Sequence, residues 1–284
     1  MEDKGFDLKP VQPPEELIGK LTAKARRLRK DVLVMLAKAG SGHTGGSLSA
    51  VDILTTLYYH VLHHRPDEPG WPDRDRFVLS KGHAAPSLYA VLADCGYFPV
   101  KHLKTLRRLG SPLQGHPCLC TPGVEICTGS LGHGLSLANG MALGLRIDRK
   151  DSRVYALLGD GECEEGEVWE AAMSSAHFKL SNLTAIVDKN RLQIDGPTSE
   201  VMNIDPLDEK FRSFGWQALV VDGHDFKQLL SAFRFAAQER RCPTVIIANT
   251  VKGKGVSFME NNLEFHGRAP TEEELKWALA ELGK

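Results

Sequence analysis

The chain has 284 residues, of which 42% are hydrophobic and 25% charged, and its 35 Lys and Arg residues against 36 Asp and Glu residues leave a formal net charge of -1. This is the composition of an ordinary globular protein, and it excludes a disordered tail, a collagen-like fibre and a repeat array. A nearly neutral chain has no net field to hold a polyanion, so we expect no nucleic-acid partner.

The chain shows no membrane or secretion signal. No stretch approaches the roughly 18 to 20 apolar residues that a membrane span needs, and the N-terminus MEDKGFDLKPVQPPEEL lacks the apolar centre of a signal peptide.

The six cysteines are few for this length, so we expect a cytoplasmic protein with reduced thiols. Cys118, Cys120 and Cys127 cluster near His116, but C-x-C is not the usual spacing of zinc ligands, and we expect no zinc site.

The first predicted elements are an arm and a long helix. Residues 1–14 are expected to form an extended N-terminal arm because prolines at 10, 13 and 14 block a helix, and residues 15–284 are expected to form one domain. Apolar residues spaced three and four apart predict a helix from Glu15 to a stop at Gly40. A glycine-rich loop over 40–46 follows. A second helix is then predicted from Ser49, with Asp52 as its capping-box partner, to about His64.

The rest of the chain alternates strands with helices. The predicted strands span 76–80, 154–158, 183–187, 218–221 and 244–248, and the predicted helices span 86–93, 100–109, 134–145, 165–178 and 226–238. Strands that alternate with helices of this length form parallel sheets covered on both sides. The predicted fold class is therefore α/β, a doubly wound, mostly parallel sheet with helices on both faces.

Polar or glycine-rich loops follow four of these strands, and ligands of open parallel sheets bind beyond the carboxyl ends of the strands. A turn, a helix and a strand separate Asp160 from Asn190, which makes a right-handed crossover. If the two strands are neighbours, their ends lie about 4.8 Å apart. A carboxylate and an amide oxygen suit Mg²⁺, which keeps positions for phosphate oxygens, and the glycines beside Asp160 let phosphate approach the backbone. The pattern predicts a clamp for a metal and a diphosphate.

Simpler interpretations compete with this one. Gly-Asp-Gly after a strand is most often a tight turn, and a lone Asn is usually a turn former. Other phosphate and calcium motifs fail: Glu167 stands where a P-loop needs Lys, the glycines do not form G-x-G-x-x-G, and Leu192 and Gln193 do not suit a calcium loop. A nicotinamide oxidoreductase is therefore the least favoured alternative.

The segment GDGECEEGEVWEAAMSSAHFKLSNLTAIVDKNRLQIDG resembles the thiamine diphosphate motif, a Gly-Asp-Gly followed by an Asn roughly thirty residues later. Five further segments resemble transketolase in particular, in collinear order: SGHTGGSLSAVDIL, LSKGHAAPSLYAVL, QGHP, TGSLGHGLSLANGMALG and HGRAP. The resemblance covers about residues 15–270. It implies the thiamin diphosphate-binding fold, and within it the domain that binds the diphosphate.

The resemblance also implies roles for individual residues. Asp160 and Asn190 would ligate Mg²⁺ or Ca²⁺, with the main-chain carbonyl of Leu192 as a third protein ligand. Besides Asp160 and Asn190, the implied contacts to thiamine diphosphate are His83, Gly129, Leu131, Gly159, Gly161, Glu162 and His266. The implied catalytic residues, which would line the substrate channel or reach the reacting centre, are His43, His83, His116 and His266.

Several other residues have weaker expectations. Glu165 would lie at a subunit interface, and the role of His133, which stands where many transketolases have Gln, is open. Lysines 81, 252 and 254 could balance phosphate charge, although exposure is the default for lysine. Five other histidines are expected on helix faces as surface or packing residues, namely His60, His63, His64, His102 and His177.

The resemblance covers only one domain of transketolase. The family's other domain binds the aminopyrimidine ring and supplies the glutamate that activates the cofactor, and neither it nor a C-terminal domain fits after Lys284. Because the chain ends in an apparent helix, TEEELKWALAELGK, we expect a natural N-terminal subunit that works with a C-terminal transketolase subunit in an α2β2 assembly. The expected reaction transfers a two-carbon ketol unit from a ketose phosphate to an aldose phosphate.

Two alternatives to this function stay open. One is a subunit of another thiamine diphosphate enzyme, resembling 1-deoxyxylulose-5-phosphate synthase or a dehydrogenase E1 component. The other is a non-catalytic subunit that binds the cofactor. The histidines at 43, 83 and 116 favour transketolase over the first alternative.

Overall fold

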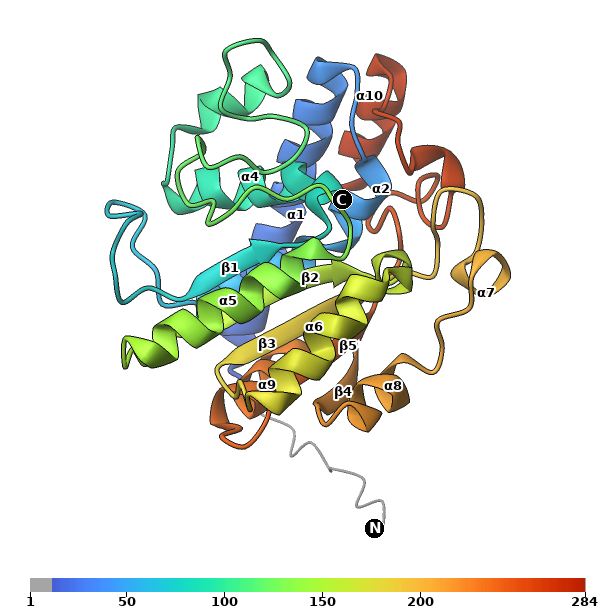
Figure 1. The fold of residues 1–284 in the computed structure, drawn as a ribbon. Coiled ribbons are helices and arrows are strands. Elements are labelled where there is room, and N and C mark those ends of the chain that lie inside the picture. Colours follow the sequence, from blue (N-terminus) through green and yellow to red (C-terminus); the bar gives the residue numbers. More distant parts are fainter. Residues whose placement is uncertain (1–11, 284) are drawn as a thin grey trace.

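The computed structural model describes residues 12–283, and a sheet of five strands in the order β1-β2-β3-β5-β4 forms its centre (Figure 1). All neighbouring strands are parallel, which confirms the predicted sheet. The observed strands agree with the predicted ones to within two residues at each end: β1 (Arg76–Leu79), β2 (Val154–Gly159), β3 (Leu183–Lys189), β4 (Gln217–Asp222) and β5 (Thr244–Asn249).

Helices cover both faces of the sheet, because alternate residues of each buried strand point to opposite sides. On β2, Tyr155 and Leu157 pack toward α1 (Glu15–Ala39), α3 (Val51–Thr56), α4 (Ala85–Cys95) and α9 (Phe226–Gln238). Ala156 and Leu158 pack toward α5 (His133–Ile147), α6 (Gly166–His177) and α8 (Leu207–Ser213). Figure 1 shows α5 and α6 lying across the front of the sheet. The chain is therefore a doubly wound α/β domain, as predicted.

The first helix forms as its apolar spacing predicts. Leu21, Leu28 and Leu36 are among the residues of α1 that are buried against the core. Gly40 ends the helix with a φ of 67°, and its amide donates to the carbonyls of the last turn. Only glycine adopts this left-handed conformation without steric cost, so the stop at Gly40 is confirmed with its mechanism.

The prediction for the next segment was wrong in two respects. The expected loop is already helical from Thr44, in α2 (Thr44–Ser49), and α3 follows it without a capping box at Ser49. Ser49 and Asp52 are both buried and have distant partners, Asp188 for the serine hydroxyl and Arg29 for the carboxylate. These tertiary contacts replace the local hydrogen bonds of a capping box.

The glycines of α2 serve close packing. A Cβ atom on Gly45 would lie 2.9 Å from Cγ of Lys252, and one on Gly46 would lie 3.2 Å from Nε2 of His83. The glycine-rich sequence therefore lets a helix approach other side chains closely.

Beyond α3 the chain makes a π-helical turn over Leu57–Val61, which leaves His63 and His64 past the helix on which they were expected.

Other differences from prediction are small. The short helix expected over 100–109 is a 3-10 helix over Val100–Thr105, and α7 (Thr198–Val201) and α8 were not predicted. The helix α10 (Glu272–Glu281) begins with a complete capping box between Thr271 and Glu274. Most of the expected N-terminal arm, residues 1–11, lies outside the described residues. Within residues 12–283, no helix has both the length and the apolar character that crossing a membrane would require.

Candidate active site

A cavity of about 250 Å³ opens where the strands end, between the loops that follow β1, β2, β3 and β5. All the residues predicted for the site line this cavity: His43, His83, His116, Gly129, Leu131, Gly159, Asp160, Gly161, Glu162, Asn190, Leu192 and His266. Four residues outside that set line it too, namely Lys81, Gln193, Ile194 and Lys252. The structure thus brings segments from across the chain to one place.

Asp160 and Asn190 stand beyond the tips of neighbouring strands, since the β2–β3 register ends with Gly159 beside Asp188. The Asp160 carboxylate accepts from the amide of Gly161 at 3.0 Å and from the amide of Arg191 at 2.5 Å. The Asn190 side-chain oxygen accepts from the amide of Leu192 at 3.2 Å. Both side chains are buried. The backbone hydrogen bonds therefore hold two oxygen atoms that could ligate a metal at one end of the cavity.

Burial raises the pKa of Asp160 to about 6, and the nearby negative charge of Asp188 contributes. A cation beside this carboxylate would favour its charged form. Oxygen donors that leave room for phosphate oxygens suit Mg²⁺ or Ca²⁺. Within residues 12–283 no group of three or more His, Cys, Asp or Glu side chains is arranged to hold a metal. A metal at the cavity would instead use a carboxylate, an amide and a main-chain carbonyl, and the Asp160–Asn190 end supplies these.

Lys252 supplies a buried positive charge to the cavity. Its Nζ donates to the carbonyl oxygen of Leu192 at 2.7 Å and lies 2.7 Å from Nδ1 of His266. Burial, together with the charge of Lys81, lowers the pKa of Lys252 to about 8. The Lys252 ammonium group therefore donates a hydrogen bond to the Leu192 carbonyl, which was predicted as the third metal ligand.

Lys81 supplies a second buried charge, at the end of β1. Its Nζ pairs with Asp188 at 2.5 Å, and the two side chains are 1% and 0% exposed. The Asp188 carboxylate also accepts from the hydroxyls of Ser49 and Thr250. Lys81 and Lys252 are both buried, unlike most lysines. Lys254 lies outside this cavity and pairs with Glu260 at 3.5 Å.

The four predicted histidines converge in the cavity. The ring centre of His43 lies 5.2 Å from that of His83, 6.4 Å from that of His116 and 5.7 Å from that of His266. Burial is the main cause that lowers all four pKa values, to about 4 for His43 and His266. These imidazoles are therefore neutral at pH 7 and can each donate and accept a proton.

His43 Nδ1 is a buried nitrogen without a hydrogen-bond partner among the described residues. Buried polar atoms in native proteins are normally satisfied, so a bound group that forms a hydrogen bond with this nitrogen would fit here. The buried ammonium group of Lys252, this unpaired nitrogen and the oxygens of Asp160 and Asn190 fit a metal-bound diphosphate with an organic group attached.

Glu162 holds the surrounding loops together. Its carboxylate accepts from the hydroxyl of Ser80 at 2.5 Å and from the amides of Gly132 and Gly159 at 2.9 Å each. It therefore ties the turn after β2 to the segments that follow β1 and precede α5. Gly129 approaches His116 so closely that a Cβ atom would lie 3.3 Å from the imidazole ring.

Two residues with open or weaker roles lie at the surface. His133 pairs through Nδ1 with Glu167 at 2.7 Å, and its side chain is 50% exposed. This gives His133 a partner on α6, away from the cavity lining. Glu165 is exposed at the start of α6, where a partner chain would be able to reach it.

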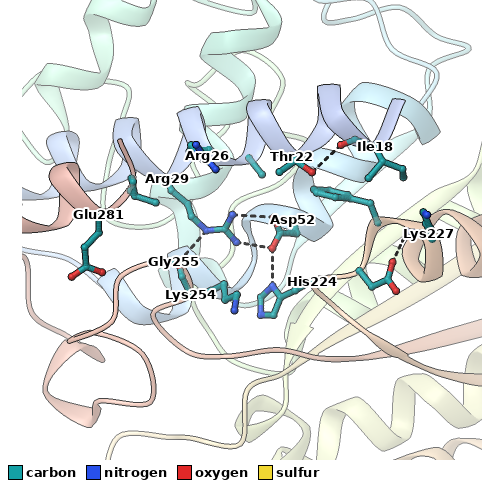
Figure 2. Close-up of a pocket in the computed structure, with 14 residues that line it drawn as sticks. Ile18, Thr22, Arg26, Arg29, Asp52, His224, Lys227, Lys254, Gly255 and Glu281 are labelled. Atoms are coloured by element: carbon teal, nitrogen blue, oxygen red, sulfur yellow. Dashed lines mark hydrogen bonds and ion pairs between the residues drawn. The ribbon is translucent and has the colours of Figure 1, made fainter. Parts of the chain in front are cut away.

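A second cavity, of about 580 Å³, borders the loop that carries Lys252, and Figure 2 shows its interior. Arg29 forms a two-pronged ion pair with Asp52 at 3.0 and 2.6 Å, and Nδ1 of His224 lies 2.7 Å from the same carboxylate. Nε2 of His224 accepts from the amide of Val251 at 2.8 Å. This network connects α1 and α3 to the residue before Lys252, so it fixes the loop. Among the residues that the structure describes, this cavity shares none of its lining with the candidate site.

Sequence and structure comparisons agree on the family. The profile described as "Transketolase, thiamine diphosphate binding domain" matches residues 20–284. The 6-deoxy-6-sulfo-D-fructose transketolase subunit SqwG of Clostridium sp. (strain MSTE9) is 46% identical, over 93% of this chain and 96% of its own length. An apulose-4-phosphate transketolase subunit of Phocaeicola vulgatus is 41% identical, over 93% of this chain and 94% of its own length.

Longer transketolases match through part of their length. Human transketolase is 42% identical over 90% of this chain, which spans 41% of it. The crystal structure of transketolase from Campylobacter jejuni matches with a TM-score of 0.88 and 36% identity, over 93% of this chain and 42% of the crystallised one. The chain therefore belongs to the transketolase family, in which it corresponds to the N-terminal, thiamine diphosphate-binding domain.

Proposed function

We propose that this chain is the N-terminal subunit of a split transketolase, which binds the metal–diphosphate part of thiamine diphosphate and transfers a two-carbon ketol unit from a ketose phosphate to an aldose phosphate with a second polypeptide. The observation that carries the proposal is the single cavity lined by every residue predicted for the site. We also propose a cytoplasmic location, which suits six free cysteines.

We assign the metal to one end of the cavity. Asp160, Asn190 and the carbonyl of Leu192 would hold Mg²⁺ or Ca²⁺, and the amides near Gly161 would face the diphosphate. The buried ammonium group of Lys252 supports this assignment because an anionic ligand would offset a charge held away from water, whereas the Lys81 charge is already paired with Asp188.

The histidines would act on the substrate side. When bound, thiamine diphosphate supplies the carbanion chemistry at its thiazolium ring. His43, His83, His116 and His266 are neutral and mutually close, so they would hold sugar hydroxyls and move protons to and from them.

The cavity wall supports the need for a second chain. Leu131 and Ile194 line the cavity although their side chains are 40% and 69% exposed. Apolar residues at the mouth of a polar site are typical of a surface that a partner covers. We propose that the partner carries the pyrimidine-binding and C-terminal domains and that the two chains form an α2β2 assembly.

Reconstitution tests the proposal. The chain alone is expected to give no turnover above background, and the chain mixed with the C-terminal polypeptide from the same genome is expected to elute as one complex and transfer ketol units in the presence of thiamine diphosphate and Mg²⁺. Gel filtration and a coupled assay measure these outcomes. Full activity of the isolated chain would contradict the split arrangement.

The same complex distinguishes the alternatives. Turnover of pyruvate would favour another class of thiamine diphosphate enzyme, and cofactor binding that adds no turnover would favour a non-catalytic subunit. The two split relatives are named for different ketoses, apulose 4-phosphate and 6-deoxy-6-sulfo-D-fructose. A donor panel that contains both, together with common ketose phosphates, identifies the natural class of donor.

Replacing Lys252 with Met is expected to change the binding of metal and of cofactor in opposite directions. Loss of the ammonium frees the Leu192 carbonyl, so Mn²⁺ alone is expected to bind more tightly. Loss of a charge facing the diphosphate is expected to weaken thiamine diphosphate binding at saturating Mg²⁺ by about tenfold or more. Electron paramagnetic resonance of free Mn²⁺ and calorimetry with the cofactor measure the two affinities. Lys254→Met is the matched control, and equal weakening of both ligands in Lys252→Met would contradict the prediction.

A further inference from the structure

Three of the six cysteines, Cys118, Cys120 and Cys127, lie together on the loop before α5. Sγ of Cys118 and Sγ of Cys120 are 2.8 Å apart, and the amide of Cys120 donates to Sγ of Cys118 at 3.4 Å. The amide of Leu119 donates to Sγ of Cys127 at 3.4 Å. A hydrogen bond of 2.9 Å from the amide of Thr121 to the carbonyl of Cys118 closes a turn around the pair.

We propose that Cys118 and Cys120 form a reversible disulfide when the protein meets a hydroperoxide, which makes this turn an oxidation site two residues beyond the cavity residue His116. A disulfide has an S–S length of about 2.05 Å, so the sulfurs need to approach by only about 0.8 Å. The turn already holds them face to face, and little backbone movement is required.

The surroundings favour these thiols over the others. Cys120 and Cys127 are exposed and Cys118 is half-buried, so a small peroxide reaches the cluster. Hydrogen bonds from the thiol and amide of Cys120, and from Cys127, lower the pKa of Cys118, which increases its thiolate fraction. Burial instead raises the pKa of Cys95 to about 11 and that of Cys163 well above the usual value.

The reaction balances in two steps. The Cys118 thiolate attacks one oxygen of the hydroperoxide, the O–O bond breaks, and a sulfenic acid and hydroxide (or an alkoxide) result. The Cys120 sulfur then attacks the sulfenic sulfur, the S–O bond breaks, and the disulfide forms with loss of water. Each thiol is oxidised by one electron while the peroxide is reduced by two. A dithiol reductant reverses the change by thiol–disulfide exchange.

The turn is connected to the candidate site. His116 is two residues before Cys118, and its carbonyl accepts from the hydroxyl of Tyr89 at 2.9 Å. The hydroxyl of Thr121 donates to the carbonyl of Pro112 at 2.7 Å on the other side of the turn. Pro117 alone separates His116 from Cys118, so even the small displacement of Cys118 on disulfide formation is expected to reach the backbone that positions the His116 ring. We expect oxidation to lower turnover reversibly, a consequence that rests on the proposed function, whereas the disulfide itself does not.

The test treats the chain and its assembled complex with hydrogen peroxide and measures intact mass and free thiols. The expected result is a loss of 2 Da and of two thiols, mapped by digestion to the peptide of residues 109–146 and reversed by dithiothreitol. Cys127→Ser is expected to behave as the parent protein, and Cys120→Ser to form no disulfide in this peptide. A disulfide that persists in Cys120→Ser, or addition of oxygen without loss of 2 Da, would overturn the proposal.

Turnover of the complex is the second measurement. Reversible loss of activity in the parent protein, absent in Cys120→Ser, supports the connection to His116. A disulfide that leaves turnover unchanged overturns that connection and leaves the oxidation site in place. A complex that has no transketolase activity before oxidation instead counts against the proposed function, and the mass measurement still decides whether the disulfide forms.

Discussion

Asp160→Asn is expected to weaken the binding of thiamine diphosphate with Mg²⁺ by about 100-fold or more and to abolish turnover at ordinary cofactor concentrations. Loss of groups that only orient a metal ligand already costs about 10- to 100-fold in affinity, so loss of the charged ligand should reach at least the upper figure. The Asn side-chain oxygen still accepts one of the two backbone hydrogen bonds that Asp160 receives, so the fold should survive. Calorimetry of the assembled complex measures the change.

A matched control stands at the opposite end of the same strand. Asp151 is exposed ahead of β2, and Asp151→Asn makes the same chemical change far from the strand tips. This variant is expected to bind the cofactor as the parent protein does. Cofactor affinity within threefold of the parent in Asp160→Asn, with the fold intact by circular dichroism, would contradict the assignment of the metal.

Asp188→Ala is expected to lower the free energy of unfolding by about 3–5 kcal/mol, because it leaves the Lys81 ammonium buried without its partner. The two hydroxyls that donate to Asp188 lose their acceptor at the same time. Urea unfolding of the isolated chain, followed by circular dichroism, gives the free energy by linear extrapolation.

The neighbouring residue of the same strand provides the comparison. Lys189 pairs with Asp205 at 2.5 Å, but the Asp205 side chain is 49% exposed. Lys189→Met is therefore expected to change the free energy of unfolding by less than about 1 kcal/mol. A double variant that replaces Lys81 with Met and Asp188 with Leu should recover most of the loss, since no buried charge remains. Equal effects of Asp188→Ala and Lys189→Met would contradict the account of the buried pair.

The sheet and its order of loops could be predicted because the determining signals are local. Continuously apolar strands such as β3 and β5, each bounded by polar residues, indicate burial on both sides and hence a parallel sheet. The topology then requires the residues after each strand to meet at one edge. The strand assignments place Asp160 and Asn190 at this edge and predict their convergence if the two strands are neighbours, and the β2–β3 pairing confirms that condition.

The features that could not be predicted depend on contacts between distant segments. Ser49 and Asp52 have the spacing of a capping box, yet their partners are Asp188 and Arg29, which no local pattern indicates. Lys81 follows β1 directly, and this position was the one available signal for its place in the site. Its burial depends on Asp188, 107 residues later in the chain.

The expected roles of the cavity residues came from the resemblance to transketolase. The structure adds the burial and the hydrogen bonds of individual side chains, which the resemblance did not give. Lys252 was given two interpretations, a group that balances phosphate charge and an exposed lysine by default; it is 2% exposed and donates a hydrogen bond to the Leu192 carbonyl. Nδ1 of His43 has no hydrogen-bond partner among the described residues. The sequence could not indicate this, because it depends on the positions of all the neighbouring hydrogen-bonding groups.

A crystal structure of the assembled complex with thiamine diphosphate and Mn²⁺ would locate the metal, because anomalous scattering identifies Mn²⁺. We expect one Mn²⁺ bound by oxygens of Asp160, Asn190 and the Leu192 main chain, at about 2.0 to 2.6 Å, together with oxygens of the diphosphate. We also expect Lys252 to have left the Leu192 carbonyl. Anomalous density elsewhere, or a diphosphate bound away from the ends of β2 and β3, would contradict the account.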